Sequence, residues 1–295
     1  MRVLVTGAEG QLARSLVERG AAHPQIEVIA LGRPKLDLEV PGSGGHAVAD
    51  VRPDAVINAA AYTAVDQAED EPDRAFRINA EAAGEVAAAA ESIGARFIQI
   101  STDYVFDGRG DGPYAEDAKP NPFSVYGRTK LAGEEAVRSA NPHHVIVRTA
   151  WVYSPFGHNF VKTIMRAAGT RDVLNVVDDQ RGSPSSALDL ADGLLSLIEI
   201  WRGGGATGLG KTYHLAGTGS TTWYGFAQAI MAECRKRSLP AAEVQPIATA
   251  DWPTKAVRPA NSVMSSAKFA RDFGFTMPRW ERSLAAVVGR LAKEA

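Results

Sequence analysis

The chain has 295 residues, of which 45% are hydrophobic and 22% charged, so it is long enough to bury a large core in one large domain or two modest ones. This composition excludes a disordered or fibrous protein, and the net charge of −2 argues against a nucleic-acid or membrane-binding surface. Cys234 is the single cysteine, which excludes an intrachain disulfide and a cysteine-rich metal site, and we predict no metal. The short apolar run at the N-terminus is neither a signal-peptide core nor a membrane span, so we expect a cytoplasmic protein.

The first predicted element is a buried strand over residues 2–6, and a glycine-containing turn follows it at once. Gly7 and Gly10 lie in this turn, and a helical period of apolar residues begins at Leu12. A strand, a glycine turn and a helix N-terminus in this order form a pyrophosphate site, because glycines let the backbone approach the anion and the helix dipole favours its charge. The spacing departs from G-x-G-x-x-G, with Ala13 at the third position. We predict a dinucleotide site here, and an ordinary glycine turn is the alternative.

The second predicted strand, residues 27–31, indicates which coenzyme binds. It runs into a basic segment in which Arg33 stands where an acidic residue would hold the ribose 2′-hydroxyl of NADH. A guanidinium is suited to a 2′-phosphate, so the segment favours NADPH and leaves NADH open. A solvated loop charge is the alternative interpretation of Arg33. Asp37 and Leu38 follow and complete the predicted coenzyme contacts of this segment, with Asp37 on the adenine side.

Strands and helices alternate through the first half of the chain. Strands are expected at 54–58, 96–100 and 144–148, and helices at 73–93 and 124–139. This alternation is typical of an α/β fold with a Rossmann-type, doubly wound parallel sheet, which we expect over residues 1–150.

After residue 150, shorter elements replace the regular alternation of strands and helices. We therefore expect residues 151–295 to form mainly a smaller C-terminal α/β substrate-binding domain. The segment 172–201 holds an apolar run and a helix-like stretch, and its return to the first domain stays open.

Two predicted strands end in residues suited to a ligand. The strand at 54–58 ends in Asn58-Ala-Ala-Ala-Tyr62-Thr63, whose small residues let a dinucleotide pass close to the backbone. The strand at 96–100 ends in Ser101-Thr102-Asp103-Tyr104. Ligands of doubly wound folds bind beyond the carboxyl ends of strands, so a hydroxyl here can face a substrate carbonyl. Ordinary end-of-strand hydroxyls are the alternative.

Tyr126 and Lys130 lie four residues apart in the predicted helix 124–139. Residues at this spacing share one helix face, so the phenol and the ammonium can converge on one bound molecule. This is the geometry that a carbonyl reductase needs for its acid group. A packing tyrosine beside a solvated lysine is the alternative interpretation of the pair alone.

In combination these motifs make the chain resemble the extended short-chain dehydrogenase/reductase family, and within it the dTDP-4-dehydrorhamnose reductases. The resemblance spans almost the whole chain. The motifs that carry it, besides the Gly7/Gly10 turn and Asn58-Ala-Ala-Ala, are Ser-Thr-Asp-Tyr-Val-Phe at 101–106, Val-Tyr-Gly-Arg-Thr-Lys-Leu-Ala-Gly-Glu at 125–134, Arg-Thr-Ala-Trp-Val-Tyr at 148–153, Asn-Phe-Val-Lys-Thr at 159–163, Asp-Gln-Arg-Gly-Ser-Pro at 179–184, Thr-Thr-Trp-Tyr at 221–224 and Arg-Pro-Ala-Asn-Ser at 258–262.

The resemblance implies reduction of the C4 ketone of dTDP-4-dehydro-L-rhamnose to dTDP-L-rhamnose, a cell-surface polysaccharide precursor. In this role Thr102 hydrogen-bonds the ketone, Tyr126 donates the proton, and Lys130 binds the nicotinamide ribose and favours tyrosinate by lowering the pKa of Tyr126. The oligomeric state stays open, with a homodimer as one alternative. The implied coenzyme contacts are Gly10, Gln11, Leu12, Ala61, Tyr62, Thr63, Tyr126 and Lys130. The implied sugar-nucleotide contacts are Thr102, Asp103 and Trp151, to which we add Asn159, Lys162, Arg258 and Asn261 as a surface for a nucleoside diphosphate sugar.

Single residues help to distinguish this function from other functions that occur on the same fold. A sugar-nucleotide 4,6-dehydratase would need an Asp-Glu pair after Thr102, and Asp103 is followed by Tyr104, which disfavours elimination. Another sugar-nucleotide reductase or an epimerase stays open. The chain is also similar to the non-catalytic, nucleotide-binding regulatory subunit of methionine adenosyltransferase, although an intact Thr102, Tyr126 and Lys130 argue for catalysis. Ser185, where threonine often follows the proline, departs from the family pattern.

Overall fold

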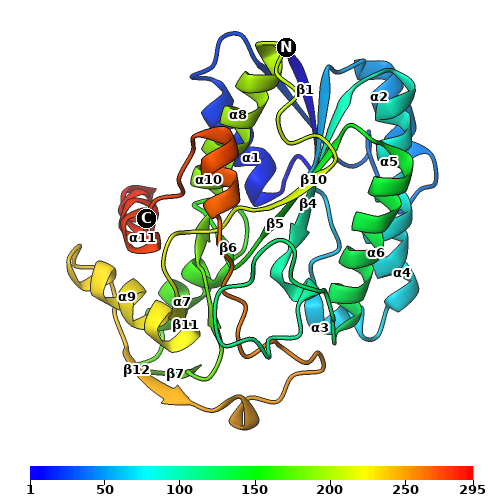
Figure 1. The fold of residues 1–295 in the computed structure, drawn as a ribbon. Helices are drawn as coiled ribbons and strands as arrows, with labels where there is room; N and C mark the ends of the chain where they lie inside the picture. The colour runs from blue at the N-terminus through cyan, green and yellow to red at the C-terminus, as the bar shows by residue number, and fades with distance from the viewer. Residues whose placement is uncertain (295) are drawn as a thin grey trace.

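The computed structural model describes residues 1–294 and contains a central parallel sheet between layers of helices (Figure 1). The sheet has six strands in the order β2-β1-β3-β4-β5-β10. Its strands are β1 (Arg2–Thr6), β2 (Glu27–Leu31), β3 (Ala55–Asn58), β4 (Arg96–Thr102), β5 (His144–Thr149) and β10 (Lys211–His214). The predicted fold class, an α/β protein with a Rossmann-type doubly wound sheet, is confirmed.

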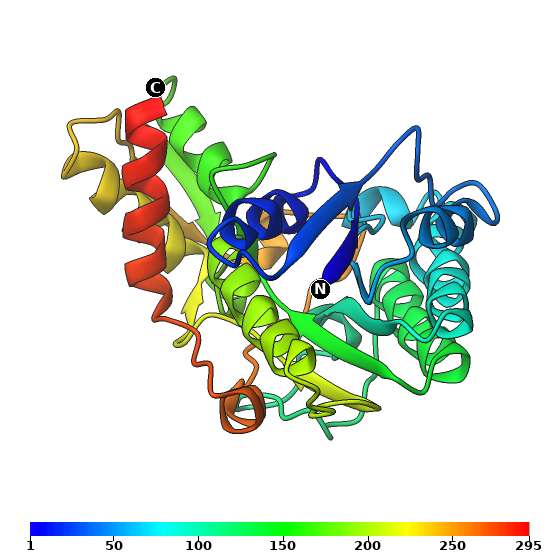
Figure 2. The same cartoon turned by 90° about the horizontal axis from the view of Figure 1, so that it is seen from above.

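Alternate residues of β1 point into two different cores, as the period of a strand requires. Val3 and Val5 pack among the apolar residues of α1 (Gln11–Gly20) and α8 (Ala187–Arg202). Leu4 packs on the opposite face, with residues of three other helices. These are α2 (Ser43–Val51), α5 (Ala82–Ser92) and α6 (Val125–Ala140). Figure 2, seen from above, shows the two helical layers on either side of the strands.

The predicted helix 73–93 is present as three consecutive helical segments. They are α4 (Pro72–Phe76), a π-helical turn (Arg77–Glu81) and α5. The predicted strand at 96–100 continues to Thr102 as β4, because Ser101 and Thr102 still pair with Arg148 and Thr149 of β5. Among residues 1–294, no helix is long and apolar enough to cross a membrane.

The chain after residue 150 contributes to two places in the fold. Helix α8 packs against α1, and β10 pairs with β5 at the edge of the main sheet. Strand β10 was not predicted from the sequence. Its Tyr213 is fully buried against Phe269 and Phe273 of α10 (Ala267–Phe273), so tertiary packing rather than local pattern forms this strand.

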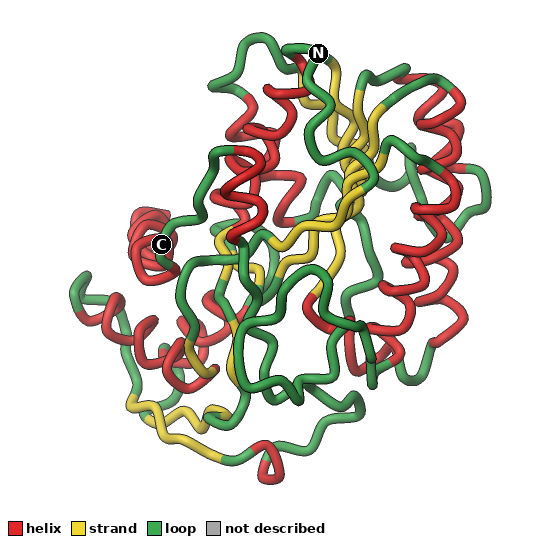
Figure 3. The backbone as a smooth tube through the Cα atoms, viewed as in Figure 1, coloured by secondary structure: helices red, strands yellow, loops and turns green. Residues whose placement is uncertain are grey.

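The remaining elements form a smaller unit with its own core below the sheet (Figure 3). Its helices are α7 (Phe160–Ala168), α9 (Trp223–Arg235) and α11 (Trp280–Glu294). Its short strand pairs are β6 (Val152–Tyr153) with β9 (Ser185–Ser186), β8 (Arg181–Gly182) with β11 (Thr221–Thr222), and β7 (Val173–Val177) with β12 (Glu243–Ile247). The carboxyl ends of the main strands face this unit, and the short helix α3 (Val65–Ala68) and a 3-10 turn (Asp103–Val105) follow β3 and β4 there.

Candidate active site

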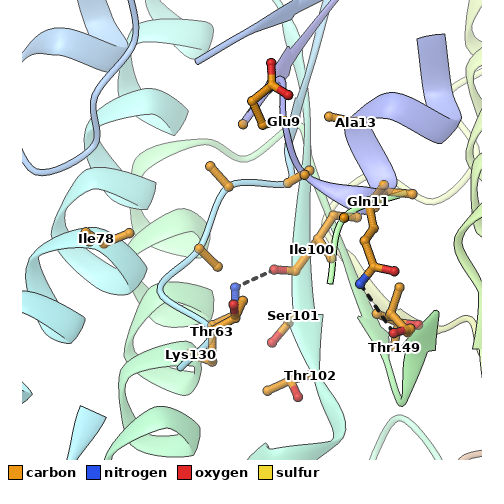
Figure 4. A pocket seen from close by; sticks show the side chains of 18 of the residues that line it. Glu9, Gln11, Ala13, Thr63, Ile78, Ile100, Ser101, Thr102, Lys130 and Thr149 are labelled. Atoms are coloured by element: carbon orange, nitrogen blue, oxygen red, sulfur yellow. Dashed lines mark hydrogen bonds between the residues drawn. The ribbon is translucent and has the colours of Figure 1, made fainter. Parts of the chain in front are cut away.

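A cleft of about 800 Å³ runs along the carboxyl ends of the sheet strands, between the sheet and the smaller unit. Many of the residues predicted from sequence meet in its walls. They are Gly7, Gly10, Gln11, Leu12, Arg33, Asp37, Leu38, Ala61, Thr63, Thr102, Asp103, Tyr126, Lys130 and Trp151. Figure 4 shows Gln11 and Lys130 on the two sides of the end of β4, with Ser101 and Thr102 between them.

The glycine turn after β1 brings backbone to the cleft without side chains. Gly7 has φ +83°, a conformation that L side chains rarely adopt, and a Cβ there would lie 3.1 Å from the Cβ of Ala60. Gly10 precedes α1, and no side chain caps this helix. The N–H groups of the first turn are therefore available to a ligand, and the helix dipole favours an anion at this position.

Charged side chains line the cleft where the second strand ends. The Arg33 side chain is 70% exposed, and its Nη1 lies 3.8 Å from Oε1 of Glu39. Glu39 is held more closely by Arg74, which donates to the same oxygen at 2.6 Å. The Arg33 guanidinium thus has one weak carboxylate partner, Glu39, and is available to bind an anionic group of a ligand.

Thr102 and Asp103 form a buried pair at the end of β4. The Thr102 hydroxyl accepts from the backbone N–H of Tyr104 at 3.2 Å and donates to Oδ1 of Asp103 at 2.9 Å. Burial raises the pKa of the Asp103 carboxyl to about 6, although the hydroxyls of Ser262 and Thr102 oppose the rise. The other oxygen, Oδ2, has no hydrogen-bond partner among residues 1–294.

Helix α6 carries the Tyr126–Lys130 pair into the cleft. The helix begins after Ser124, whose hydroxyl accepts from the backbone N–H of Gly127 at 3.1 Å. The rings of Tyr126 and Tyr104 meet edge to face, with centroids 5.4 Å apart. The ammonium of Lys130 donates to the carbonyl oxygen of Ile100 at 2.7 Å, so the helix is joined to β4 next to Thr102.

Burial dominates the electrostatics of the Tyr126–Lys130 pair. Burial raises the pKa of Tyr126 to about 12, with the Thr102 hydroxyl opposing the rise. Burial also lowers the pKa of Lys130 to about 8. The cost of burying a charge is thus the largest influence on the pKa of both groups, and at neutral pH the phenol keeps its proton.

Glu134 is a buried residue behind this site to which we assigned no role from sequence. It accepts from Ser101 Oγ at 2.7 Å and from Arg148 Nε at 2.8 Å, and Arg138 donates to it at 2.9 Å. Its charge opposes the fall in the pKa of Lys130. Its position, four residues after Lys130 on the same helix, was the available signal.

Five of the predicted residues do not line the cleft. Tyr62 is buried behind it and donates its hydroxyl to Glu71 at 3.1 Å. Arg258 forms an ion pair with Asp66 at 2.7 Å. Asn261 donates to the carbonyl oxygen of Gly110 at 2.7 Å and borders a second, smaller hollow.

The other two lie at the start of α7. The Asn159 side chain caps this helix and also donates to Oε1 of Gln11 at 3.0 Å, so it positions a cleft residue rather than facing the cleft. Lys162 donates to the carbonyl oxygen of Pro155 at 3.2 Å. Trp223, by contrast, does line the cleft, and sequence analysis included its motif without assigning it a binding role. Among residues 1–294, no group of three His, Cys, Asp or Glu side chains is placed to hold a metal.

Comparisons with known proteins agree with this geometry. A family model described as the RmlD substrate binding domain matches residues 1–293. A dTDP-4-dehydrorhamnose reductase from Sinorhizobium fredii is 42% identical over 294 residues, which cover 100% of this chain and 99% of the relative.

Two solved structures extend the comparison. The crystal structure of a dTDP-4-dehydrorhamnose reductase from Clostridium acetobutylicum has a TM-score of 0.91 and 39% identity, covering 99% of each chain. That of the Bacillus anthracis dTDP-4-dehydrorhamnose reductase in complex with NADP has a TM-score of 0.90 and 37% identity, covering 98% of this chain and 99% of the other. The predicted resemblance is confirmed, and the chain belongs to the family of dTDP-4-dehydrorhamnose reductases that the RmlD substrate binding domain describes.

Proposed function

We propose that this protein reduces the C4 ketone of dTDP-4-dehydro-L-rhamnose to dTDP-L-rhamnose with NADPH. The observation that carries the proposal is the meeting of Thr102, Tyr126 and Lys130 in one cleft. The whole-chain similarity to dTDP-4-dehydrorhamnose reductases supports the choice of substrate. The cleft volume of about 800 Å³ lies in the upper part of the range of ligand pockets, roughly 300–1,000 Å³.

The cleft fits a nicotinamide dinucleotide at its β1 end. The close approach of Gly7 and Ala60, where a Cβ at residue 7 would lie only 3.1 Å from that of Ala60, supports a pyrophosphate position against the N-terminus of α1. Arg33 would hold the 2′-phosphate of NADPH, and the Bacillus anthracis structure, which contains NADP, supports this choice. Ala61 and Thr63 would border the coenzyme further along the cleft. Bound NADPH supplies the hydride.

The proton comes from this chain. The raised pKa of Tyr126 keeps its hydroxyl protonated at neutral pH, which is the form that donates to the C4 oxygen. Rotation of the Thr102 hydroxyl from Asp103 toward the substrate gives that oxygen a second donor. With a pKa of about 8, Lys130 is mostly charged at neutral pH and stabilises negative charge that develops as the proton leaves Tyr126.

The sugar nucleotide is proposed to lie toward the smaller unit. Asp103 and Trp151 border this side of the cleft, and Arg258 would reach a diphosphate only by exchanging its carboxylate partner Asp66. We also propose that the sugar-nucleotide side of the cleft is supported by Asn159, Lys162 and Asn261. In this division residues 1–150, joined by α8 and β10, hold the coenzyme, and most of residues 151–295 hold the sugar nucleotide.

The substitution Tyr126→Phe tests the assignment. It removes the proton donor, so kcat should fall by about a hundredfold or more while the Kd of NADPH stays within about twofold. Tyr104→Phe is the matched control, because this phenol lies in the same cleft in contact with Tyr126. Near-normal turnover by Tyr126→Phe, or an equal loss in Tyr104→Phe, would show that the acid is assigned wrongly.

The place of the reaction in the cell and the assembly of the enzyme are also proposals. The nearly balanced charge and the single cysteine support the cytoplasm. A homodimer is the assembly that we propose, and light scattering of the purified protein measures its mass.

A further inference from the structure

Trp151 adopts an unfavourable backbone conformation beside the cleft. Its φ is +47°, a value that is rare for bulky side chains. The surrounding strands hold this conformation, because the backbone N–H of Ser185 donates to the carbonyl oxygen of Trp151 at 3.1 Å and Val152 pairs with Ser185. Strain of this kind persists where the surroundings impose it, and it concentrates at ligand sites.

The indole of Trp151 is stacked on that of Trp223. The ring centroids are 3.5 Å apart and the planes differ by 5°, so the rings overlap almost completely. Aromatic pairs prefer an offset or edge-to-face arrangement, so the packing around the pair holds it in this form. Trp223 is the first residue of α9, which the Thr222 hydroxyl caps, and Phe160 packs on Trp223 with a centroid distance of 4.6 Å.

Gly182 covers the other face of Trp151. A Cβ at this glycine would lie 2.3 Å from Cε2 of the indole, and its three nearest atoms all belong to Trp151. Since no Trp223 atom is among them, Gly182 and Trp223 approach opposite faces of the ring. The antiparallel pairing of Gly182 with Thr221 joins β8 to β11, and β11 runs directly into Trp223 at the start of α9. The two indoles therefore form one fixed aromatic plate.

The plate lies near the proposed reacting carbonyl. In the pairing of β4 with β5, Thr149 is opposite Thr102, and Trp151 is only two residues beyond Thr149. Both indoles line the cleft together with Thr102 and Tyr126, and both are only partly buried. Because the faces of Trp151 are covered, a ligand can meet only its edge, whereas Trp223 adds apolar surface to the same wall.

We propose that Trp223 is a further substrate-binding residue, which completes an aromatic wall for the apolar side of the 6-deoxy sugar and holds Trp151 in position. This inference rests on the proposed function. The carbon atoms of an indole offer no hydrogen-bond partner to a 6-hydroxyl but pack well on a methyl group, so a wall in which these atoms face the sugar favours a 6-deoxyhexose. The nucleotide moiety lies outside this contact.

The test measures binding of dTDP-L-rhamnose and of dTDP alone to wild-type, Trp223→Ala and Trp223→Phe proteins. Trp223→Ala should raise the Kd of dTDP-L-rhamnose by about tenfold, which corresponds to about 1.4 kcal/mol, and leave the Kd of dTDP and of NADPH unchanged. Trp223→Phe should restore part of the affinity. Trp252→Phe, whose indole is 57% exposed and does not line the cleft, is the matched control and should change none of these values.

Circular dichroism gives a readout that does not depend on ligand, since closely stacked indoles couple their transitions. The coupled band should be present in wild type, absent in Trp223→Ala and weakened in Gly182→Ala, whose new methyl group displaces Trp151. Unchanged affinity of Trp223→Ala for dTDP-L-rhamnose, or an equal loss for dTDP, overturns the inference while the proposed reductase stands. Wild-type protein that binds no dTDP-L-rhamnose overturns both.

Discussion

Replacing Asp103 by Asn should stabilise the protein at neutral pH. Asp103 is 2% exposed, and its Oδ2 has no hydrogen-bond partner among residues 1–294. Burial raises the pKa of this carboxyl from an ordinary value of 3.8 to about 6. The ionised form is therefore disfavoured in the folded protein, and Asn keeps the shape of the side chain without the charge.

The sign and size of the effect follow from linkage. Because the folded-state pKa is raised, the stability that Asp103 contributes is fully present below about pH 4 and is lost as pH rises through about 6. The difference between the two pKa values corresponds to about 3 kcal/mol. The advantage of Asp103→Asn over wild type should thus grow from near zero at about pH 4 to about 3 kcal/mol above about pH 7.

Urea unfolding of both proteins at several pH values between about 4 and about 8 measures this difference. Asp107→Asn is the control of opposite sign, since hydrogen bonds from the backbone of Arg109 and from Asn121 hold the pKa of Asp107 below its usual range. That variant should be less stable than wild type by an amount that is nearly complete above about pH 5 and then stays constant up to about pH 8, because the stability contributed by Asp107 is lost only as pH falls through its lowered pKa. A difference for Asp103→Asn that is independent of pH, or that turns negative at neutral pH, would refute the reasoning.

Two further predictions concern coenzyme choice and pH. Arg33→Ala should raise the KM of NADPH by about tenfold and leave that of NADH within about twofold, because only NADPH carries the anion that Arg33 would meet. Glu39→Gln removes the carboxylate near Arg33 and should lower the KM of NADPH. Steady-state kinetics with NADPH and with NADH measure both effects. If the KM values of the two coenzymes changed by the same factor in Arg33→Ala, the assignment of Arg33 would be disproved. Burial holds the pKa of Lys130 at about 8, so this ammonium loses its charge as pH rises through that value and kcat should fall above it. A kcat that stays level from about pH 7 to about pH 10 would contradict this role.

Local sequence signals predicted the coenzyme end of the site and the placement of the Tyr126–Lys130 pair. The run before Gly7 is a buried strand, because parallel strands covered on both faces need continuous apolar residues. The spacing of four residues places Tyr126 and Lys130 on one side of α6, and both reach the cleft.

Contacts between segments that are distant in the sequence could not be predicted from local sequence signals. The segment Lys211–His214 has no marked alternation, and it becomes β10 because Tyr213 packs into a core that other elements supply. The partners of Glu134 come from β4, β5 and its own helix, so its buried ion pair becomes apparent only in three dimensions. The expected effect of Lys130 on the pKa of Tyr126 stays a prediction, because burial is the largest influence on the pKa of both groups in this structure.

The substrate side was the hardest to predict. Arg258 was chosen for its charge, but a single sequence does not reveal that Asp66 takes up that charge. In the same way, the stacking of Trp151 on Trp223 depends on Gly182, which lies in a third segment.

The most direct test of the central claim follows the absorbance of NADPH when the purified protein meets dTDP-4-dehydro-L-rhamnose, with the product identified by mass. We predict substrate-dependent oxidation in which each NADPH consumed yields one dTDP-L-rhamnose. Coenzyme that binds tightly but is not oxidised, with either NADPH or NADH, would contradict the assignment of this cleft as a reductase site.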